Sequence, residues 1–514
     1  MERIFVSVAS YRDTECQHTI KDLFEKADQP DRVFVGICWQ YISEEDDDCF
    51  QIPSPRPDQT RIIHKDAREG KGACWARSLV QSLWQGEEYF FQIDAHSRFV
   101  QGWDTILLDM LKKCPPRSVL TSYPTSYEPP DKLGPKNVVT ISAKDFDEKG
   151  LLAFSSSSTP EEQAPYELTP TFFLGAGLVF GPSEIIIECP YDPYIYFTGE
   201  EITLAIRLWT HGWNLYTPNR VTVYHDYTHR DTKPRHWQDH KLWVKLSDLA
   251  CQRIRYLLEN KPVEDEQSLQ EIDKYSLGTV RTLQEYERLS GVEFSKQLIN
   301  GKTSEELEAE LPVAIRQDKV KKTFSDIWER NAWSCAESKS GPGSSLAQTE
   351  ILRSHLAYVL KALDIRTLVD AGCGDVNWMQ HISGMFDVYM GFDVADACVA
   401  ENRTKFSSRK NHFFNTADLC SDTLPKADAI FCRDVLGHLS LPLALLALKK
   451  FKESGSRYLI STTFPRGKND SIRTGSWQMI DLTAEPFNLP PPIILLDEQL
   501  PGFQKSLGVW PMQI

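Results

Sequence analysis

The chain has 514 residues, of which 41% are hydrophobic and 25% are charged, proportions that exclude a collagenous or wholly disordered protein. Its formal net charge of −15 argues against general nucleic-acid binding, which needs a basic surface to neutralise phosphates. A chain of this length exceeds a single hydrophobic core, so we expect two or three domains.

The amino terminus begins directly as a strand, MERIFVSVAS, without a basic region and an apolar signal core. No stretch approaches the roughly 18 apolar residues that a membrane span requires. The 12 cysteines form no CxxC pair and no regular framework, a pattern typical of reduced thiols. These features predict a cytoplasmic protein without an integral membrane segment. They give no oligomeric state.

Strands and helices alternate in the first half of the chain, which favours an α/β layer with a mainly parallel sheet. The predicted strands cover 4–10, 32–40, 61–67 and 89–95, and the predicted helices cover 16–27 and 73–85. A further helix is predicted over 236–259, followed by a charged loop, ENKPVEDEQ.

The same alternation restarts after a segment rich in glycine, proline and serine at 338–350, which is too irregular for a helix or strand. This second half predicts another doubly wound unit, with strands at 366–372, 388–394, 428–434 and 457–463 and helices at 348–363, 376–383, 396–407 and 441–453. We therefore predict a first domain over 1–300, a linker with a leading helix over 301–345, and a second domain over 346–514.

The triplet Asp94-Ala95-His96 ends the predicted strand at 89–95. Alternate side chains of a strand point to the same side, so the carboxylate and the imidazole could chelate one metal ion. The alternative is a helix-capping aspartate beside a surface histidine.

Other polar residues follow strands of the same sheet, where ligands of open α/β sheets bind. Gly70 and Gly72 would allow close backbone approach, and Lys71 and Arg77 could meet a diphosphate. The candidate ligand-binding residues of the first half are Ser10, Tyr11, Arg12, Arg68, Lys71 and Arg77.

An ordered series of motifs in this half resembles the GT-A glycosyltransferases, and in particular the family of N-acetylglucosaminyltransferases that act on hydroxyproline of Skp1-type proteins. The motifs are SVASYRD, REGKGACWARS, DAH, FLGAGLVFG, FTGEEITLAIRLWTHGWNLY, VYHDY and YSLGTVRTLQEYE. The resemblance implies a Rossmann-like GT-A domain that uses a UDP-sugar donor, with retention of the anomeric configuration. The sequence itself does not choose between retention and inversion.

In such enzymes a DxD or DxH element and a later histidine hold a divalent cation on the UDP diphosphate. The matching residues here are Asp94, His96 and His225. One carboxylate and two imidazoles favour Mn²⁺. Mg²⁺ is the alternative, although it suits this set of ligands less well because it prefers oxygen ligands. Glu200 and Glu201 match acids that face the acceptor and the sugar, although acids in a first helical turn also suit the helix dipole. His225 could equally be an ordinary strand-end histidine.

The run LVDAGCGDVNW places Asp370 at the end of a strand, before a turn in which Gly372 and Gly374 permit close approach to a ligand. Asp393 follows the next strand, where a carboxylate can accept hydrogen bonds from ribose hydroxyls. Asp418, in NTADLC, could meet an adenine. The turn GCGDVN lacks the GxGxxG pattern of dinucleotide-binding folds.

The series DAGCGD, GFD, ADL and FCRDVLGHLS resembles class I S-adenosylmethionine-dependent methyltransferases, and the flanking segments resemble bacterial and viral members that accompany glycan synthesis. The resemblance implies a Rossmann-like domain that binds S-adenosylmethionine. Asp434 and His438 are the candidate bases for deprotonating an acceptor hydroxyl. Asp434 could instead pair with Arg433 or cap a helix, and His438 could be an ordinary buried histidine.

The sequence thus predicts a bifunctional enzyme that transfers a sugar, N-acetylglucosamine by resemblance, to a glycan or glycoprotein and O-methylates a sugar hydroxyl. One alternative is a methyltransferase whose glycosyltransferase-like half only docks a glycan or protein. Another is a methyltransferase that acts on a protein or small metabolite unrelated to the sugar.

Overall fold

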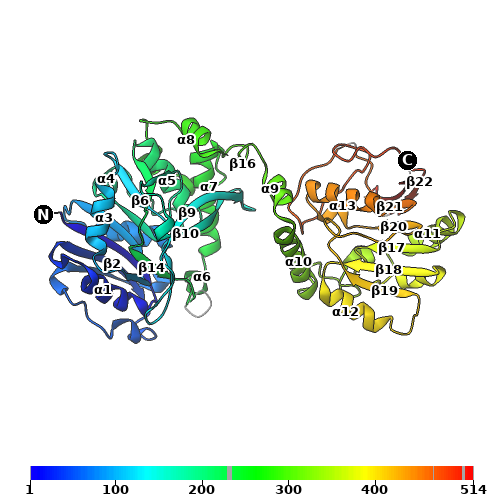
Figure 1. Cartoon of the computed structure of the whole chain (residues 1–514), viewed down its shortest axis with the longest axis horizontal. Coiled ribbons are helices and arrows are strands. Elements are labelled where there is room, and N and C mark those ends of the chain that lie inside the picture. Colours follow the sequence, from blue (N-terminus) through cyan, green and yellow to red (C-terminus); the bar gives the residue numbers. More distant parts are fainter. Residues whose placement is uncertain (1, 229–233, 467, 500–503, 513–514) are drawn as a thin grey trace. The chain divides into compact units, whose positions relative to one another are not determined.

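The computed structural model of the chain describes residues 2–228, 234–466, 468–499 and 504–512 (Figure 1). The chain divides into two compact units, Met1–Ser304 and Glu305–Ile514. Each unit has its own sheet, and each is described below by itself.

The N-terminal unit is built on an eight-stranded sheet of order β11-β13-β6-β12-β4-β1-β2-β3. Its strands β3, β2, β1 and β4 are parallel, and β12 and β11 run antiparallel to their neighbours. The strands are β1 (Ile4–Tyr11), β2 (Val33–Tyr41), β3 (Thr60–Asp66), β4 (Tyr89–Asp94), β6 (Ser118–Thr121), β11 (Thr169–Thr171), β12 (Leu178–Pro182) and β13 (Asn214–Thr217). The parallel core that alternation predicts is present.

A second, four-stranded sheet of order β5-β14-β7-β8 follows the end of β4. It consists of β5 (Ser97–Phe99), β14 (Val223–Asp226), β7 (Thr125–Glu128) and β8 (Lys132–Leu133). β14 runs antiparallel to β5 with His225 opposite Ser97, so a residue far along the chain lies next to the Asp94-Ala95-His96 triplet. The unit also contains a hairpin of β9 (Asn137–Phe146) and β10 (Leu152–Pro160) and a short pair of β15 (Val292–Glu293) and β16 (Leu298–Ile299).

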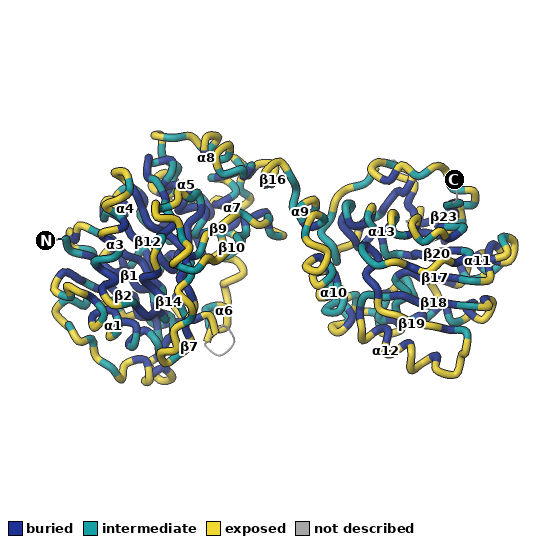
Figure 2. The backbone as a smooth tube through the Cα atoms, in the orientation of Figure 1, coloured by how far each residue is buried: buried dark blue, intermediate teal, exposed yellow. Residues whose placement is uncertain are grey.

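Helices cover both faces of the large sheet because its central strands are apolar on both sides. α1 and α3 pack on one face against Ile4, Val6 and Val8, while α2 approaches the other face near Gly36, where an added Cβ would lie 2.5 Å from the Phe5 ring. Figure 2 shows the central strands β1 and β2 as buried, whereas the edge strands β3 and β11 are only partly buried or exposed. The helices are α1 (Glu15–Lys26), α2 (Ala73–Gln81), α3 (Trp103–Leu111), α4 (Glu184–Glu188), α5 (Glu200–Thr210), α6 (His236–Asp239), α7 (Trp243–Glu259) and α8 (Leu283–Ser290).

The single helix predicted over 236–259 is wrong, because α6 ends at Asp239 and α7 begins at Trp243. His240 is extended, with φ −114° and ψ 101°. The turn of α6 is held by tertiary contacts: Asp239 accepts hydrogen bonds from Tyr11 and Arg12. These contacts outweigh the helical periodicity of the segment.

The C-terminal unit contains a seven-stranded sheet of order β19-β18-β17-β20-β21-β23-β22. The first five strands are parallel, and β23 runs antiparallel to both of its neighbours. The strands are β17 (Thr367–Ala371), β18 (Val388–Asp393), β19 (His412–Thr416), β20 (Ala429–Cys432), β21 (Tyr458–Thr463), β22 (Ile494–Asp497) and β23 (Ser506–Pro511).

Neighbouring residues of these strands belong to different hydrophobic clusters because strand side chains alternate between the faces. Leu368 packs in one cluster and Val369 in the other, as do Phe431 and Ile430. α11 covers the first face and α13 the second, which gives three layers. The helices of the unit are α9 (Ser304–Glu310), which begins at the boundary, α10 (Val313–Glu329), α11 (Glu350–Ala362), α12 (Asp396–Lys405) and α13 (Leu441–Glu453).

The α-helix predicted over 376–383 is wrong, because this stretch forms two short 3₁₀ turns, Met379–His381 and Ser383–Met385. Val376 has a positive φ of 54°, a conformation that a helix interior cannot contain. The stretch remains buried through Trp378 and Met379 and packs under α11 in the same cluster.

No helix within the described part of the chain has the length and apolar character needed to cross a membrane.

Candidate functional sites

Asp94 ends β4 of the N-terminal unit, and β14 brings His225 to it. The distance between His225 Nε2 and Asp94 Oδ2 is 3.2 Å. The ring of His96 lies 4.5 Å from the ring of His225, measured between centroids. The three residues that the sequence predicts as metal ligands therefore meet in one place.

His96 is oriented by a carboxylate, since its Nδ1 lies 2.6 Å from Asp13 Oδ2. A carboxylate on one ring nitrogen fixes the orientation of the imidazole and leaves the other nitrogen as a ligand, which is the usual support of a metal-bound histidine. His225 is half-buried, with 12% of its side chain exposed, and desolvation lowers the pKa of its imidazole, so the ring is neutral near pH 7.

Among the described residues, no group of three or more His, Cys, Asp and Glu side chains stands arranged to hold a metal ion. In the structure His225 Nε2 contacts Asp94 directly. Its Nδ1 is buried and has no hydrogen-bond partner within the described residues. The donor types, one carboxylate and two imidazoles, fit a transition-metal ion such as Mn²⁺ chemically.

Arg77, from α2, joins this triplet to the start of α5. It donates a hydrogen bond of 2.8 Å to Asp94 Oδ1 and another to Glu200, which also accepts 2.9 Å from the Tyr191 hydroxyl. Burial alone would raise the pKa of Asp94, but the hydrogen bond from His225 and the charge of Arg77 outweigh it and hold that pKa below its ordinary range. Asp94 is thus a carboxylate at every physiological pH.

Glu201 points toward the motif FLGAGLVFG, residues 173–181, rather than toward Arg77. Its side chain accepts hydrogen bonds of 2.7 Å from the Tyr123 hydroxyl and 2.8 Å from the Ala176 backbone N–H, and burial raises its pKa. A Cβ added at Gly177 would lie 3.2 Å from Asp94 Oδ2, so this glycine leaves room directly beside the metal-ligand candidates. The acid pair, the glycine motif and the Asp94 triplet share one site.

The last two residues of β1, Ser10 and Tyr11, and the adjoining Arg12 border the same edge of the sheet. The hydroxyl of Ser10 is buried without a hydrogen-bond partner in the described part of the chain. Tyr11 donates 2.8 Å to Asp239, and Arg12 pairs with three carboxylates, those of Asp239, Glu45 and Asp46. The charge of Arg12 is therefore already matched by protein acids.

The other two basic residues predicted to bind the donor, Arg68 and Lys71, lie at the surface. Arg68 is exposed and paired with Asp66, and the Lys71 side chain is exposed. Neither is drawn into the Asp94 cluster by a hydrogen bond or ion pair in the described residues. Only Arg77, of the predicted basic residues, contacts that cluster.

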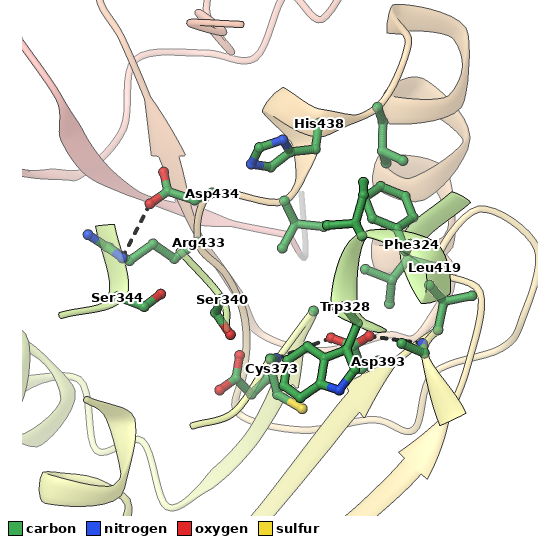
Figure 3. Close-up of a pocket in the computed structure, with 18 of the residues that line it drawn as sticks. Phe324, Trp328, Ser340, Ser344, Cys373, Asp393, Leu419, Arg433, Asp434 and His438 are labelled. Atoms are coloured by element: carbon green, nitrogen blue, oxygen red, sulfur yellow. Dashed lines mark hydrogen bonds and ion pairs between the residues drawn. The ribbon is translucent and has the colours of Figure 1, made fainter. Parts of the chain in front are cut away.

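The C-terminal unit has a cavity of about 140 Å³ at the carboxyl ends of its parallel strands. Its lining includes all seven residues that the sequence predicts for this unit, namely Asp370, Gly372, Gly374, Asp393, Asp418, Asp434 and His438. Figure 3 labels Asp393, Asp434 and His438 among them.

Asp370 is buried at the end of β17 and accepts a hydrogen bond from Tyr389. No cation contacts it in the described residues, and burial raises the pKa of its carboxyl to about 7. Gly372 and Gly374 both have positive φ, and a Cβ on Gly372 would lie 2.3 Å from the Val435 side chain. The turn can follow this path only with glycine.

Asp393 faces the same turn, where it accepts 3.1 Å from the Gly374 backbone N–H and 3.0 Å from that of Ala395. Burial nevertheless raises its pKa. Asp418 accepts 2.9 Å from the Cys420 backbone N–H and 2.6 Å from the Ser421 hydroxyl. Both carboxylates are held by backbone or hydroxyl donors at the cavity wall.

Asp434 and His438 lie together at one end of the cavity (Figure 3) and differ in their partners. Asp434 contacts Arg433, at 3.2 Å, and Lys505; although burial opposes it, these charges lower its pKa to about 2. His438 Nδ1 donates 2.7 Å to the Ser476 carbonyl, and the ring of Trp333 lies 4.9 Å from the His438 ring, measured between centroids. His438 therefore presents Nε2 as a proton acceptor.

The sequence did not single out two walls of this cavity. α10 supplies apolar side chains, and the segment 338–344 closes over the glycine turn because Ser338, Lys339 and Ser340 all hydrogen-bond to Asp375. Part of these walls comes from the segment from Trp328 to Thr349, which the sequence identified only as a flanking segment that resembles other methyltransferases. The additional lining residues are Val320, Phe324, Ile327, Trp328, Trp333, Ser340 and Ser344.

Two family models match the chain. The model described as "Glycosyltransferase (GlcNAc)" matches residues 3–63 and 52–296, more than half of the chain. The model described as "Methyltransferase domain" matches residues 343–491. No curated protein matches.

Several solved structures are similar to parts of the chain at low identity. GalNAc-T7 with UDP, GalNAc and Mn²⁺ is 15% identical over 56% of this chain and 58% of its own, with a TM-score of 0.38. Magnesium protoporphyrin IX methyltransferase (ChlM) from Synechocystis PCC 6803 with bound SAH is 21% identical over 30% of this chain and 73% of its own, with a TM-score of 0.24. The methyltransferase domain of bacterial CtHen1 is 17% identical over 32% of this chain and 100% of its own, with a TM-score of 0.26.

The family matches agree with the two Rossmann-like sheets. The chain belongs to the GlcNAc glycosyltransferase family, with a GT-A-type glycosyltransferase unit followed by a class I methyltransferase unit.

Proposed function

We propose that the chain is a bifunctional glycan-modifying enzyme. Its N-terminal unit transfers N-acetylglucosamine from UDP-N-acetylglucosamine to a hydroxyl of a glycan or glycoprotein, and its C-terminal unit O-methylates a sugar hydroxyl with S-adenosylmethionine. The observation that carries the first activity is the meeting of Asp94, His96 and His225 beside Arg77 and Glu200.

Asp94, His96 and His225 would hold the divalent ion, Mn²⁺ by their donor types. A bound ion supplies positive charge that stabilises the diphosphate as it leaves the sugar. Asp13 keeps His96 oriented, and the low pKa of Asp94 keeps its carboxylate charged for the ion. The contact between His225 and Asp94 would then give way to contacts of both side chains with the ion.

The acid pair of α5 would position the reacting hydroxyls. Arg77 ties Glu200 to Asp94, so Glu200 holds a fixed place near the leaving diphosphate. Glu201 is close to Gly177, where the sugar has room, and can accept a hydrogen bond from a donor or acceptor hydroxyl.

The nucleotide would lie along the end of β1 and the residues that precede α2. Ser10 offers an unpartnered hydroxyl, and Lys71 an exposed ammonium. Tyr11, Arg12 and Arg68 would first have to exchange their present carboxylate partners. We therefore expect Tyr11, Arg12 and Arg68 to contribute less to the affinity for the UDP-sugar than Ser10 and Lys71 do.

In the methyltransferase unit the glycine turn and Asp393 would bind the methionine and ribose parts of S-adenosylmethionine, Asp418 the adenine. S-adenosylmethionine, when bound, supplies a methyl group whose bond to sulfur breaks as its bond to the acceptor oxygen forms. His438 Nε2 would take the proton of that hydroxyl, because its Nδ1 already donates to Ser476. Asp434 is too acidic, with a pKa of about 2, to serve as the base near pH 7.

Both activities on one chain would raise the concentration of a shared acceptor at the second site. We infer that the methyltransferase unit acts on the glycan that the first unit extends. In a coupled assay with both donors, the transferred product should become methylated; an extended glycan that is never methylated would separate the two activities.

Mn²⁺-dependent hydrolysis of UDP-sugars tests the first activity without knowledge of the acceptor. We expect the full chain to hydrolyse UDP-N-acetylglucosamine faster than other UDP-sugars, and the Asp94→Ala variant to lose this hydrolysis. A glycosyltransferase-like unit that only docks glycans would hydrolyse no UDP-sugar at all. Transfer of labelled methyl from S-adenosylmethionine to glycosides tests the second activity.

A further inference from the structure

A second, small cavity adjoins the methyl donor cavity of the C-terminal unit. Its volume is about 10 Å³, which is the space of about one water molecule or one hydroxyl group. Asp434 and Val435 line both cavities. We call this space the hydroxyl chamber; its lining also includes Cys432, Leu436, Gly437, Ser461, Thr462, Phe464, Trp477, Gln478 and Ile480.

Gln478 is the polar side chain of the chamber that lacks partners. The residue is 7% exposed, and neither its amide nitrogen nor its amide oxygen has a hydrogen-bond partner in the described parts of the chain. Buried amides are nearly always hydrogen-bonded, so the Gln478 amide is available to hydrogen-bond a group that enters the chamber. An amide both donates and accepts, as a hydroxyl group does.

The segment that carries Gln478 is fastened to the segment that carries His438. Gln478 N donates 2.9 Å to the Gly437 carbonyl, and Gly475 N donates 2.8 Å to the His438 carbonyl. His438 Nδ1 donates 2.7 Å to the Ser476 carbonyl. A Cβ on Gly437 would lie 2.7 Å from the Gln478 carbonyl oxygen. The candidate base and the unpartnered amide are therefore held at a fixed separation.

Trp477 stands at the chamber with 48% of its surface exposed. Phe464 contacts it edge to face, at 6.1 Å between centroids and 86° between planes, which fixes the indole. A fixed and half-exposed indole offers an apolar face with room for the apolar face of a sugar ring.

We propose that the hydroxyl chamber is an acceptor subsite of the methyltransferase unit. It takes one hydroxyl of a sugar ring that lies on Trp477, and Gln478 hydrogen-bonds that hydroxyl while a different hydroxyl of the same ring faces His438. Gln478 is thus a specificity-determining residue for the position that becomes methylated. This inference rests on the proposed sugar O-methylation.

The size and charge of the chamber exclude other occupants. A carboxylate or phosphate is larger than the space of one water molecule. A charged group would also need a counter-charge, but Gln478 is neutral and Asp434 is already paired with Arg433 and Lys505. A single neutral hydroxyl meets both limits.

The test uses the full chain, S-adenosylmethionine with a labelled methyl group, and a panel of methyl glycosides of hexoses and 6-deoxyhexoses. The glycoside with the highest turnover is then compared with its monodeoxy analogues. We expect one analogue, which still carries the methylated hydroxyl, to lose kcat/KM by about 10- to 100-fold, mainly through KM, because it leaves Gln478 unpaired.

Gln478→Met removes the amide at nearly constant shape. This variant should lose a similar factor with the parent glycoside and should no longer distinguish it from that analogue, while its Kd for S-adenosylhomocysteine stays unchanged. Gln348→Met, at an exposed glutamine of the same unit, is the matched control and should behave as wild type. Gln478→Asn, which withdraws the amide by one methylene, should show partial discrimination and serves if the methionine variant does not fold.

The outcomes separate the two proposals. If no glycoside of the panel is methylated, the proposed sugar O-methylation is wrong, and this inference, which rests on it, is wrong as well. If glycosides are methylated but Gln478→Met or Gln478→Asn discriminates as wild type does, only the inference falls. A crystal structure with S-adenosylhomocysteine and the glycoside gives a second reading: a sugar hydroxyl on Gln478 supports the subsite, and a water molecule that stays there overturns it.

Discussion

The two sites hold their buried acids in opposite ways. Around the end of β4, Asp94 and Glu200 share Arg77, and the pKa of Asp94 is low. In the methyltransferase cavity, Asp370 and Asp393 have no cation within the described residues, and burial raises the pKa of each. Under the proposed function, the low pKa of Asp94 keeps the first site charged for an ion that would bind the diphosphate. The second has negative charge that a cationic ligand, such as a sulfonium, would compensate.

The strongest test of this comparison removes the charge of the first site. Asp94→Ala should lower UDP-N-acetylglucosamine hydrolysis by about 1,000-fold, because the variant loses a ligand of the ion that stabilises the leaving diphosphate. Methyl transfer by the other unit should not change. Asp109→Ala, at an exposed acid of α3, is the control. Hydrolysis that persists in Asp94→Ala would contradict the metal assignment.

The second test addresses the base of the C-terminal site. His438→Asn should lower kcat for methyl transfer by about 100-fold and leave the Kd of S-adenosylhomocysteine unchanged, since it removes only a proton acceptor. His381→Asn, at an exposed histidine, is the control.

The pH profile sharpens this assignment. Burial lowers the pKa of His438, so the ring becomes protonated, and useless as a base, only at a pH below the ordinary value of about 6.5. We expect the acid limb of the kcat profile in that range for the wild type and no such limb for His438→Asn. An acid limb well above neutral pH would assign the proton transfer to another group.

A third test measures the burial of Asp370. Its folded pKa of about 7 lies above the unfolded value of about 3.9, so the folded state binds an extra proton between these values. The stability of the C-terminal unit should therefore fall as pH rises from about 4 through 7, by roughly 2–4 kcal/mol.

Asp370→Asn should remove most of this dependence and leave the part that Asp393 contributes. The measurement is the unfolding transition that S-adenosylhomocysteine shifts, followed between about pH 5 and 8. If the wild-type unit had the same free energy of unfolding at about pH 5 and pH 8, the charge of Asp370 would have to be balanced by another group, and its pKa would not be raised.

The smallest expected effect concerns the link between the two acids of the first site. Arg77→Lys keeps the charge but cannot donate to Asp94 and Glu200 in the same forked geometry. We expect about a tenfold loss of hydrolysis, roughly 1.4 kcal/mol, as one carboxylate stays unpaired. Arg68→Lys, at an exposed arginine, should change the rate far less. An Arg77→Lys variant with the wild-type rate would mean that Arg77 acts only through its charge.

The sequence predicted the parallel cores because apolar strands alternate with helices, and it predicted Asp94 and His96 because they are two residues apart at the end of a predicted strand. In the structure His96 lies in the bend between β4 and β5. Resemblance supplied His225, since no local pattern joins it to Asp94. The pairings of Arg77 with Glu200 and of Tyr123 with Glu201 depend on how the start of α5 lies against α2 and against the end of β6. The split between α6 and α7 and the 3₁₀ turns after Val376 escaped prediction because tertiary contacts and backbone conformation override periodicity there.

In the methyltransferase unit the sequence found the polar end of the cavity because its acids and glycines follow strands. It missed Gln478 and Trp477, which lie in an irregular segment whose position depends on hydrogen bonds to Gly437 and His438. It also missed the apolar wall of α10, because an amphipathic helix does not reveal what its apolar side chains cover.

That wall matters to anyone who separates the two activities by cutting the chain. The matched methyltransferase region starts at residue 343, but Phe324, Trp328 and Trp333 precede it and line the donor cavity. A fragment trimmed to the matched region would expose an open apolar trough, bind its nucleoside ligand poorly and tend to aggregate. A self-sufficient fragment has to begin upstream of Val313.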